Sequence, residues 1–102
     1  MRDLTAFQRD IMFALAKLHE PKGLDVKEYL ETYYSEEIRH GRLYPNLDAL
    51  VEKALVNKGQ HDRRTNKYTM SEEGKRELRE RIDWEMNDLP AEFIDSETTI
   101  QQ

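Results

Sequence analysis

The sequence predicts a mainly α-helical fold with one small β-hairpin and a further helix towards the C-terminus. Apolar residues recur at helical spacing in four stretches, and the third of these places Leu43, Leu47 and Leu50 on one face. The polar loop 60–66, which holds two adjacent arginines, separates two short segments that fit a hairpin. Three helices and a hairpin already close a small domain, so the fourth helix has no core of its own left to cover.

Composition limits the class of protein. The chain has 102 residues, of which 37% are hydrophobic and 36% are charged, and this balance indicates one small, highly charged globular domain. It contains no cysteine, which excludes disulfides and thiolate zinc sites. It shows neither a run of about 18 apolar residues nor the pattern of a signal peptide. We therefore expect a soluble, cytoplasmic protein with no membrane contact.

The first two helices are predicted from their start and stop signals. Thr5 and Gln8 have the spacing of a capping box, so a helix should follow to about Leu18. Its buried stripe should comprise Phe7, Ile11, Ala14, Leu15 and Leu18. Pro21 and Gly23 favour a turn, after which a second helix should run from about residue 24 to residue 33. Its buried residues should be Leu24, Val26, Tyr29 or Leu30, and Tyr33.

The position of Pro45 predicts where the third helix begins. Proline costs roughly 3 kcal/mol inside a helix but nothing in the first turn, where amides have no intrahelical partner. The helix should therefore begin near residues 42–44 and end at about residue 53 or 54. Ahead of it, Ile38 is expected to be a single-residue strand that pairs with the hairpin.

The hairpin should be followed directly by the fourth helix. Ser71 is a suitable N-cap, and Glu72 and Glu73 fit the positive end of the helix dipole. The helix should end near Leu89. Beyond it, residues 90–102 are expected to form a flexible tail.

A short amphipathic helix followed at once by a hairpin with a basic tip is the layout of a winged helix-turn-helix. Two motifs are more specific, Leu43-Tyr44-Pro45-Asn46-Leu47 in the third helix and Tyr68-Thr69-Met70-Ser71-Glu72-Glu73-Gly74 after the wing. Together with Leu50 and Leu55-Val56, they resemble the pattern of the PadR-like transcriptional regulators, and the resemblance covers residues 4–89. The acidic surface is similar to that of such regulators from salt-loving archaea, which implies high working salt.

This resemblance implies a homodimeric regulator, more often a repressor than an activator, which binds a pseudo-palindromic site in double-stranded promoter DNA. We expect residues 1–70 to form the DNA-binding domain and residues 71–89 the dimerisation helix. The short C-terminal region departs from larger relatives, whose further helices shape an effector site.

Basic residues are concentrated where a DNA-contacting element needs them. Residues 39–67 contain seven arginines and lysines against three carboxylates, a net charge of +4 within a chain of net charge −5. Arg42 and Asn46 have side chains suited to base edges. The other candidates, suited to phosphates or the minor groove, are Arg39, His40, Tyr44, Arg63, Arg64, Thr65, Asn66, Lys67, Lys22 and Lys27. The alternative is a solvated basic surface, with Tyr44 packed between helix and wing.

We expect the apolar stripe of the fourth helix to meet a second subunit; the alternative is that it packs within its own chain. Together with the first helix, it should supply the dimer interface, composed of Phe7, Ile11, Leu78, Ile82, Trp84, Met86 and Leu89. Trp84 either packs in this interface or lines a pocket for a planar aromatic effector, as in some relatives with this fold. The sequence offers no support for a particular effector and none for a cofactor.

An enzyme has little support in the sequence. His19, His40 and His61 are far apart, and none has metal-ligand spacing to another histidine. Nucleophile elbows, phosphate loops and dinucleotide fingerprints are absent from the sequence. We therefore expect no catalytic or metal site. The alternative function is a winged-helix module that binds other proteins and not DNA.

Overall fold

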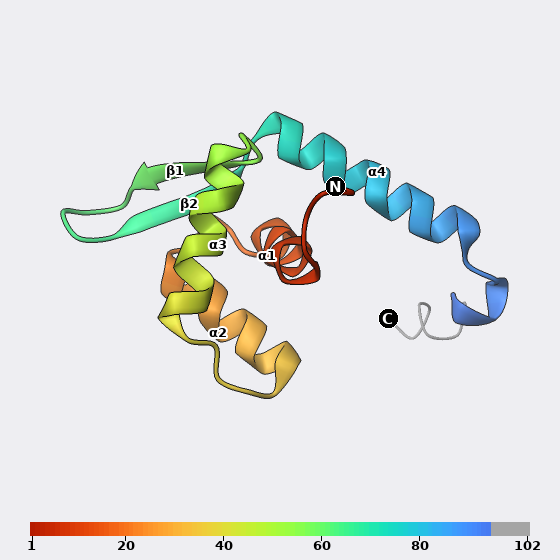
Figure 1. The fold of residues 1–102 in the computed structure, drawn as a ribbon, viewed down its shortest axis with the longest axis horizontal. Helices are drawn as coiled ribbons and strands as arrows, with labels where there is room; N and C mark the ends of the chain where they lie inside the picture. The colour runs from red at the N-terminus through yellow and green to blue at the C-terminus, as the bar shows by residue number, and fades with distance from the viewer. Residues whose placement is uncertain (95–102) are drawn as a thin grey trace.

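The computed structural model describes residues 1–94, which form four α-helices and a two-stranded antiparallel hairpin (Figure 1). In chain order the elements are α1 (Ala6–Lys17), α2 (Gly23–Tyr34), α3 (His40–Glu52), β1 (Val56–Gln60), β2 (Asn66–Met70), α4 (Glu72–Asp88) and the short 3₁₀ helix η1 (Ala91–Phe93). This order confirms the predicted mainly α winged helix-turn-helix. Of the predicted tail, residues 95–102 lie outside the described residues.

The first three helices and the wing share one hydrophobic core. Its centre is formed by side chains with almost no exposed surface: Ile11, Met12, Val26, Leu30, Ile38, Leu43, Leu47, Leu50 and Val56. The predicted stripe of the first helix is confirmed, since Phe7, Ile11, Ala14 and Leu15 are buried and Leu18 packs against the core. Two hydrogen bonds of 3.1 Å between Thr5 and Gln8 complete the predicted capping box at the start of α1.

In α2, two of the expected core residues are exposed. Leu24 is 51% exposed and Tyr33 is 74% exposed, whereas Val26 and Leu30 are buried. The buried face follows the spacing Gly23, Val26, Leu30, so Leu24 and Tyr33 fall on its flanks. Tyr34 takes the expected place of Tyr33 and stacks on Phe7, with ring centroids 6.1 Å apart.

The predicted strand at Ile38 is wrong. Ile38 is buried, but its amide donates to a carboxylate oxygen of Glu31 at 2.8 Å and not to the wing. A side chain therefore satisfies the buried amide that a strand would otherwise have paired. The backbone that does join the wing comes from the α1–α2 loop, where Pro21 accepts from the amide of Tyr68 at 2.9 Å and Lys22 bridges to Lys67.

The third helix begins earlier than expected, at His40, so Pro45 lies in its second turn and not in its first. The carbonyl of Arg39 accepts from the amides of Arg42 and Leu43, both at 3.0 Å, and thereby adds a turn ahead of the proline. The predicted end is close to the observed one at Glu52. Pro45 consequently interrupts the hydrogen-bonding pattern of the helix.

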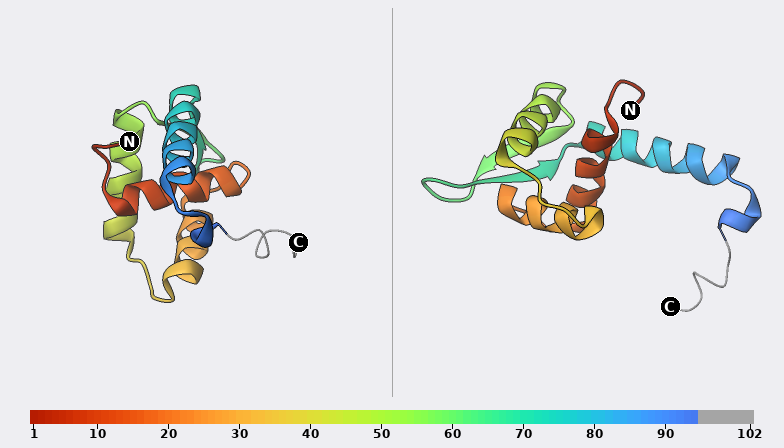
Figure 2. Two further views of the ribbon diagram at one scale, coloured as in Figure 1. Left: turned by 90° about the vertical axis from the view of Figure 1, so that its right-hand side faces the viewer. Right: turned by 60° about the horizontal axis from the view of Figure 1, so that its bottom comes forward.

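The fourth helix leaves the domain at one end and extends beyond it (Figure 1; Figure 2, right). Ser71 is its N-cap as predicted, and its hydroxyl oxygen accepts from the amide of Gly74 at 2.9 Å. The same hydroxyl donates to the carbonyl of Ala54 at 2.7 Å. Gly74 and Leu78 are buried against the domain, while the later turns of α4 carry exposed apolar side chains.

Stability at alkaline pH should depend on Tyr34. Burial, together with the hydrogen bond that its hydroxyl donates to Asp10, raises the pKa of Tyr34 to about 12 from an ordinary value of 10.0. The folded state therefore keeps a proton that the unfolded chain loses first. The corresponding stability is complete below about pH 10 and is lost between about pH 10 and about pH 12.

Urea unfolding across this pH range checks the expectation. Tyr34→Phe should unfold with a weaker pH dependence than the wild type. Tyr33→Phe removes the hydroxyl of an exposed neighbour and should retain the wild-type pH dependence. Equal pH dependences for the wild type and Tyr34→Phe would contradict the assignment.

Candidate nucleic-acid interface

A cleft of about 430 Å³ opens between three elements that are distant in the sequence. It is lined by Lys22, Gly23 and Leu24 of the α2 start, His40, Tyr44 and Asp48 of α3, and Lys58, Arg64, Thr65, Asn66 and Tyr68 of the wing. Six predicted DNA-contacting residues therefore surround one space: Lys22, His40, Tyr44, Arg64, Thr65 and Asn66. We call this surface, together with Arg63 and Lys67 of the wing, the basic face.

Glycine at the start of α2 makes room for the Tyr44 ring. A Cβ atom on Gly23 would lie 2.7 Å from the Cζ of Tyr44, which is closer than a side chain tolerates. The His40 ring stacks on the Tyr44 ring, with ring centroids 5.5 Å apart and ring planes inclined by 25°. Tyr44 is half-buried and packs against the core, yet it also lines the cleft. The two sequence interpretations of Tyr44 are thus compatible.

The wing tip is an ordered turn that displays two arginines. A carboxylate oxygen of Asp62 accepts from the amide of Arg64 at 2.9 Å, and this hydrogen bond holds the pKa of Asp62 below its usual value. The amide of His61 donates to the carbonyl of Thr65 at 2.8 Å and closes the turn. Arg63 and Arg64 are exposed, and in residues 1–94 neither forms an ion pair. Their charge is available to an anionic partner.

Two lysines of the basic face are already paired with carboxylates. Lys67 lies 3.1 Å from Glu20, and this ammonium group holds the pKa of Glu20 below its usual value. Lys58 lies 3.4 Å from Asp48 of α3. Sequence reasoning missed Lys58 and Asp48 as site residues. The predicted hairpin could have indicated Lys58, because Lys58 lies opposite Tyr68 in the register of the two strands.

Besides Arg63 and Lys67, four predicted contact residues do not line this cleft: Arg39, Arg42, Asn46 and Lys27. Arg39 is exposed at the N-cap of α3. Asn46 is engaged inside the fold, since its side chain accepts from Gln8 at 2.9 Å and donates to the Arg42 carbonyl at 2.7 Å. The Arg42 guanidinium lies 3.9 Å from the centre of the Phe7 ring, on the α1 side of α3. The ammonium of Lys27 pairs with Glu31 at 2.7 Å within α2.

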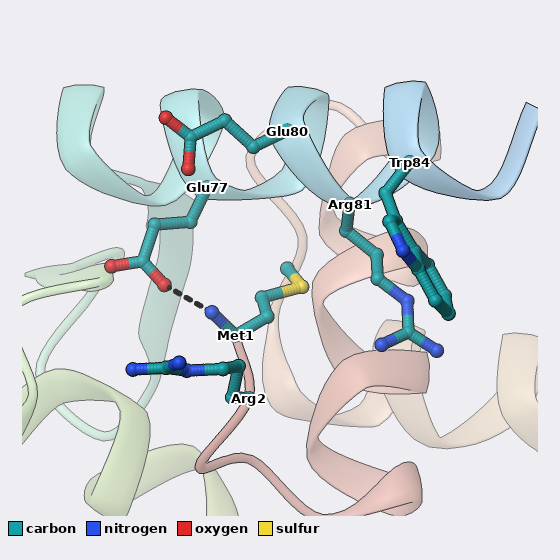
Figure 3. Close-up of a pocket in the computed structure, with 6 residues that line it drawn as sticks. All are labelled: Met1, Arg2, Glu77, Glu80, Arg81 and Trp84. Atoms are coloured by element: carbon teal, nitrogen blue, oxygen red, sulfur yellow. Dashed lines mark hydrogen bonds and ion pairs between the residues drawn. The ribbon is translucent and has the colours of Figure 1, made fainter. Parts of the chain in front are cut away.

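A second cavity, of about 390 Å³, lies between the first residues of the chain and α4 (Figure 3). Trp84 lines it together with Glu77, Glu80 and Arg81. The Arg81 guanidinium lies 5.0 Å from the centre of the Trp84 ring, and its Nε lies 2.8 Å from Glu85. The Arg81 guanidinium therefore already covers one face of the Trp84 ring. An effector bound at Trp84 stays a prediction.

The apolar surface of α4 continues past the edge of its own domain. Ile82 is 36%, Trp84 57%, Met86 48% and Leu89 43% exposed. The expectation that Phe7, Ile11 and Leu78 join a dimer interface is corrected. Ile11 has no exposed surface, Leu78 packs against its own domain, and Phe7 is covered by Tyr34 and Arg42. These three side chains serve the protomer's own packing.

Within residues 1–94, no helix is long and apolar enough to cross a bilayer. In the same part of the chain, no group of three His, Asp or Glu side chains is arranged to hold a metal ion.

Comparison with known proteins places the chain in a family. Residues 12–80 match the model of the Transcriptional regulator PadR-like family. A search of the curated proteins gave no match. Among solved structures, this chain is similar to that of RosR from Halobacterium salinarum, in the form grown from NaBr. The two sequences are 42% identical, and the TM-score is 0.87 over 98% of this chain and 93% of that one. A complex structure, hsRosR-S1, is 44% identical, with a TM-score of 0.87 over 97% of this chain and 89% of that one.

A more distant structure is that of Bacillus subtilis PadR in complex with operator DNA. It is 26% identical, with a TM-score of 0.63 over 84% of this chain and 50% of that one. The family match spans more than half of the chain and includes the helix-turn-helix, the wing and the start of α4. The protein therefore belongs to the PadR-like family of transcriptional regulators.

Proposed function

We propose that this protein binds promoter DNA as a homodimer and represses transcription by excluding polymerase. The observation that carries the proposal is the basic face, where the start of α3, the start of α2 and the arginine-bearing wing tip border one cleft. In a winged helix-turn-helix, the first turns of the third helix enter the major groove while the wing reaches the backbone or minor groove. Membership of a regulator family and the likeness to a PadR bound to operator DNA support it.

In this proposal residues 1–70 are the DNA-binding unit and α4 is the dimerisation element. Ile82, Met86 and Leu89 recur at helical spacing in line with Leu78, beyond the point where the domain can cover them. A two-fold dimer would place its recognition helices about 34 Å apart, the repeat of a DNA turn. The operator would then be pseudo-palindromic.

The charge distribution supports function at high salt in the cytoplasm. The protein has a net charge of −5, and Glu20 and Asp48 pair with lysines inside the basic face. Such pairs reduce attraction to DNA phosphates in general, so binding would depend more on hydrogen bonds and fit. The likeness to a Halobacterium protein agrees with this setting.

Fluorescence anisotropy with a labelled duplex from upstream of the protein's own gene tests the proposal. The wild type should bind it more tightly than a scrambled duplex. Arg63→Glu/Arg64→Glu should lose at least about tenfold in affinity. The slope of log affinity against log salt concentration should also become shallower by about one unit for each phosphate contact removed.

A matched control is Lys53→Glu/Arg76→Glu, which makes the same change in charge at two exposed residues, one at the end of α3 and one on the side of α4 opposite Leu78. It should bind nearly as the wild type does. If the dimer is intact but binds no DNA at any salt concentration, the protein is instead a module for binding other proteins. If DNA binding leaves transcription from the promoter undiminished in vitro, the repressor assignment is wrong.

A further inference from the structure

Pro45 removes a hydrogen bond from the middle of α3. In a regular α-helix the amide of residue 45 would donate to the carbonyl of residue 41, but proline has no amide hydrogen. Because α3 begins at His40, Pro45 lies beyond the first turn and Gly41 lies within the helix. The carbonyl oxygen of Gly41 therefore lacks the intrahelical donor that the regular pattern would provide.

This carbonyl lies on the outward side of the recognition helix. Leu43, Leu47 and Leu50 face the core, and the helical repeat of 100° per residue places Gly41 and Pro45 on the opposite side. Both residues are exposed, and a Cβ atom on Gly41 would meet nothing within 4 Å. A partner can therefore approach the backbone here without meeting any side chain at this position.

Two side-chain acceptors of α3 are engaged by other groups of the protein. The carbonyl oxygen of the Asn46 side chain accepts from Gln8, and the Asp48 carboxylate pairs with Lys58. An arginine side chain carries donors alone, so the nearby Arg39 would pair with acceptors such as guanine O6 and N7. Cytosine N4 and adenine N6 present donors in the major groove, and recognition of either needs an acceptor on the protein.

We propose that the Gly41 carbonyl accepts a hydrogen bond from an exocyclic amino group of cytosine or adenine in the major groove, so that Gly41 and Pro45 help to determine operator sequence. The inference rests on the proposed DNA-binding function and adds a specificity-determining position to it. Pro45 acts indirectly, because it has no amide hydrogen to donate to this carbonyl inside the helix. Gly41 supplies the acceptor and the room for the base to approach.

Pro45→Ala tests the proposal because it restores the missing amide. The variant should melt at a higher temperature than the wild type, since it regains a helix hydrogen bond. It should nevertheless bind the promoter duplex about tenfold more weakly, and a scrambled duplex with unchanged affinity. Unchanged affinity for the promoter duplex, with the higher melting temperature, would overturn the proposal. An equal loss on both duplexes would also overturn it, because the proline would then serve only the shape of the helix.

Base analogues give a readout that a structural effect would not produce. Promoter duplexes are prepared with single adenines replaced by purine and single cytosines replaced by 2-pyrimidinone, each lacking the exocyclic amino group. At one position in each half-site the analogue should weaken binding by the wild type but not further weaken binding by Pro45→Ala. The same analogues in the scrambled duplex control for weakened base pairing. If no position shows this coupling, the carbonyl does not contact an amino group.

Gly41→Ala keeps the test decisive if Pro45→Ala does not fold. The added methyl group meets no protein atom, so circular dichroism and melting should show an intact fold. It should still lose promoter affinity because the methyl group separates the backbone from the base. Retained affinity in Gly41→Ala would overturn the proposal. Failure of the wild type to bind the promoter duplex would instead refute the proposed function, so the two failures are distinguishable.

Discussion

Gly74→Ala should lower the free energy of unfolding by about 3 kcal/mol or more, a large part of the stability of a domain this small. Gly74 lies in the first turn of α4, where the helix crosses the backbone that leads into the wing. A Cβ atom at this position would overlap the Leu55 carbonyl oxygen and would lie 3.2 Å from the Leu55 carbonyl carbon and 3.1 Å from the Cε of Met12. Backbone atoms cannot move aside as a flexible side chain does.

Relief of this overlap would move α4 away from the wing. The Gly74 amide also donates to the hydroxyl of Ser71, which in turn donates to the carbonyl of Ala54. Displacement of the helix would therefore strain the N-cap as well as the packing. Urea or thermal unfolding followed by circular dichroism measures the loss.

Gly41→Ala is the matched control for this prediction. It makes the same chemical change inside another helix, but its Cβ atom meets nothing. Alanine is the better helix former by about 0.5–1 kcal/mol, so this variant should be slightly more stable than the wild type. Equal stabilities of Gly74→Ala and Gly41→Ala would mean that the approach between α4 and Leu55 is looser than the structure indicates.

The proposed dimerisation through α4 predicts that Met86→Glu is a monomer. Met86 is 48% exposed in the protomer and lies among Ile82 and Leu89 on the apolar side of α4. A partner helix would bury it, and a buried carboxylate without a cation to pair with costs several kcal/mol. Because the residue is exposed in the single chain, the fold of the protomer should not change. Light scattering after size exclusion gives the mass directly.

Asn87→Glu is the control for Met86→Glu. It adds the same charge one residue further along α4, on the polar side of the helix, and should remain dimeric. A monomer should also bind the promoter duplex about a hundredfold more weakly, because two half-sites can no longer be held together. A Met86→Glu protein with the dimer mass would assign dimerisation to another surface.

Local chemistry explains the elements that sequence reasoning predicted correctly. The capping box at Thr5 and Gln8, the N-cap at Ser71 and the stripe of leucines in α3 depend on neighbours within four residues. The polar loop between two short extended segments was sufficient to predict the wing. The motif around Tyr44 and Pro45 then indicated the PadR-like family, and the family match confirms that prediction.

Tertiary contacts decided what the local patterns left open. Glu31 binds the amide of Ile38, so no strand forms there, and Tyr34 packs on Phe7 in the place expected for Tyr33. Asn46 has the side chain of a base-contacting residue, but Gln8, 38 positions earlier, occupies it.

The sequence by itself determined the elements, their order and the basic character of the wing, because each of these depends on nearby residues. Only the tertiary structure decided which basic side chains share one cleft, which are held by carboxylates, and which apolar residues of α1 and α4 are buried in the protomer and which stay exposed. Those outcomes depend on contacts between distant segments, such as Lys58 with Asp48 and Lys67 with Glu20. Helical periodicity identifies a face of a helix, but it does not identify what covers that face.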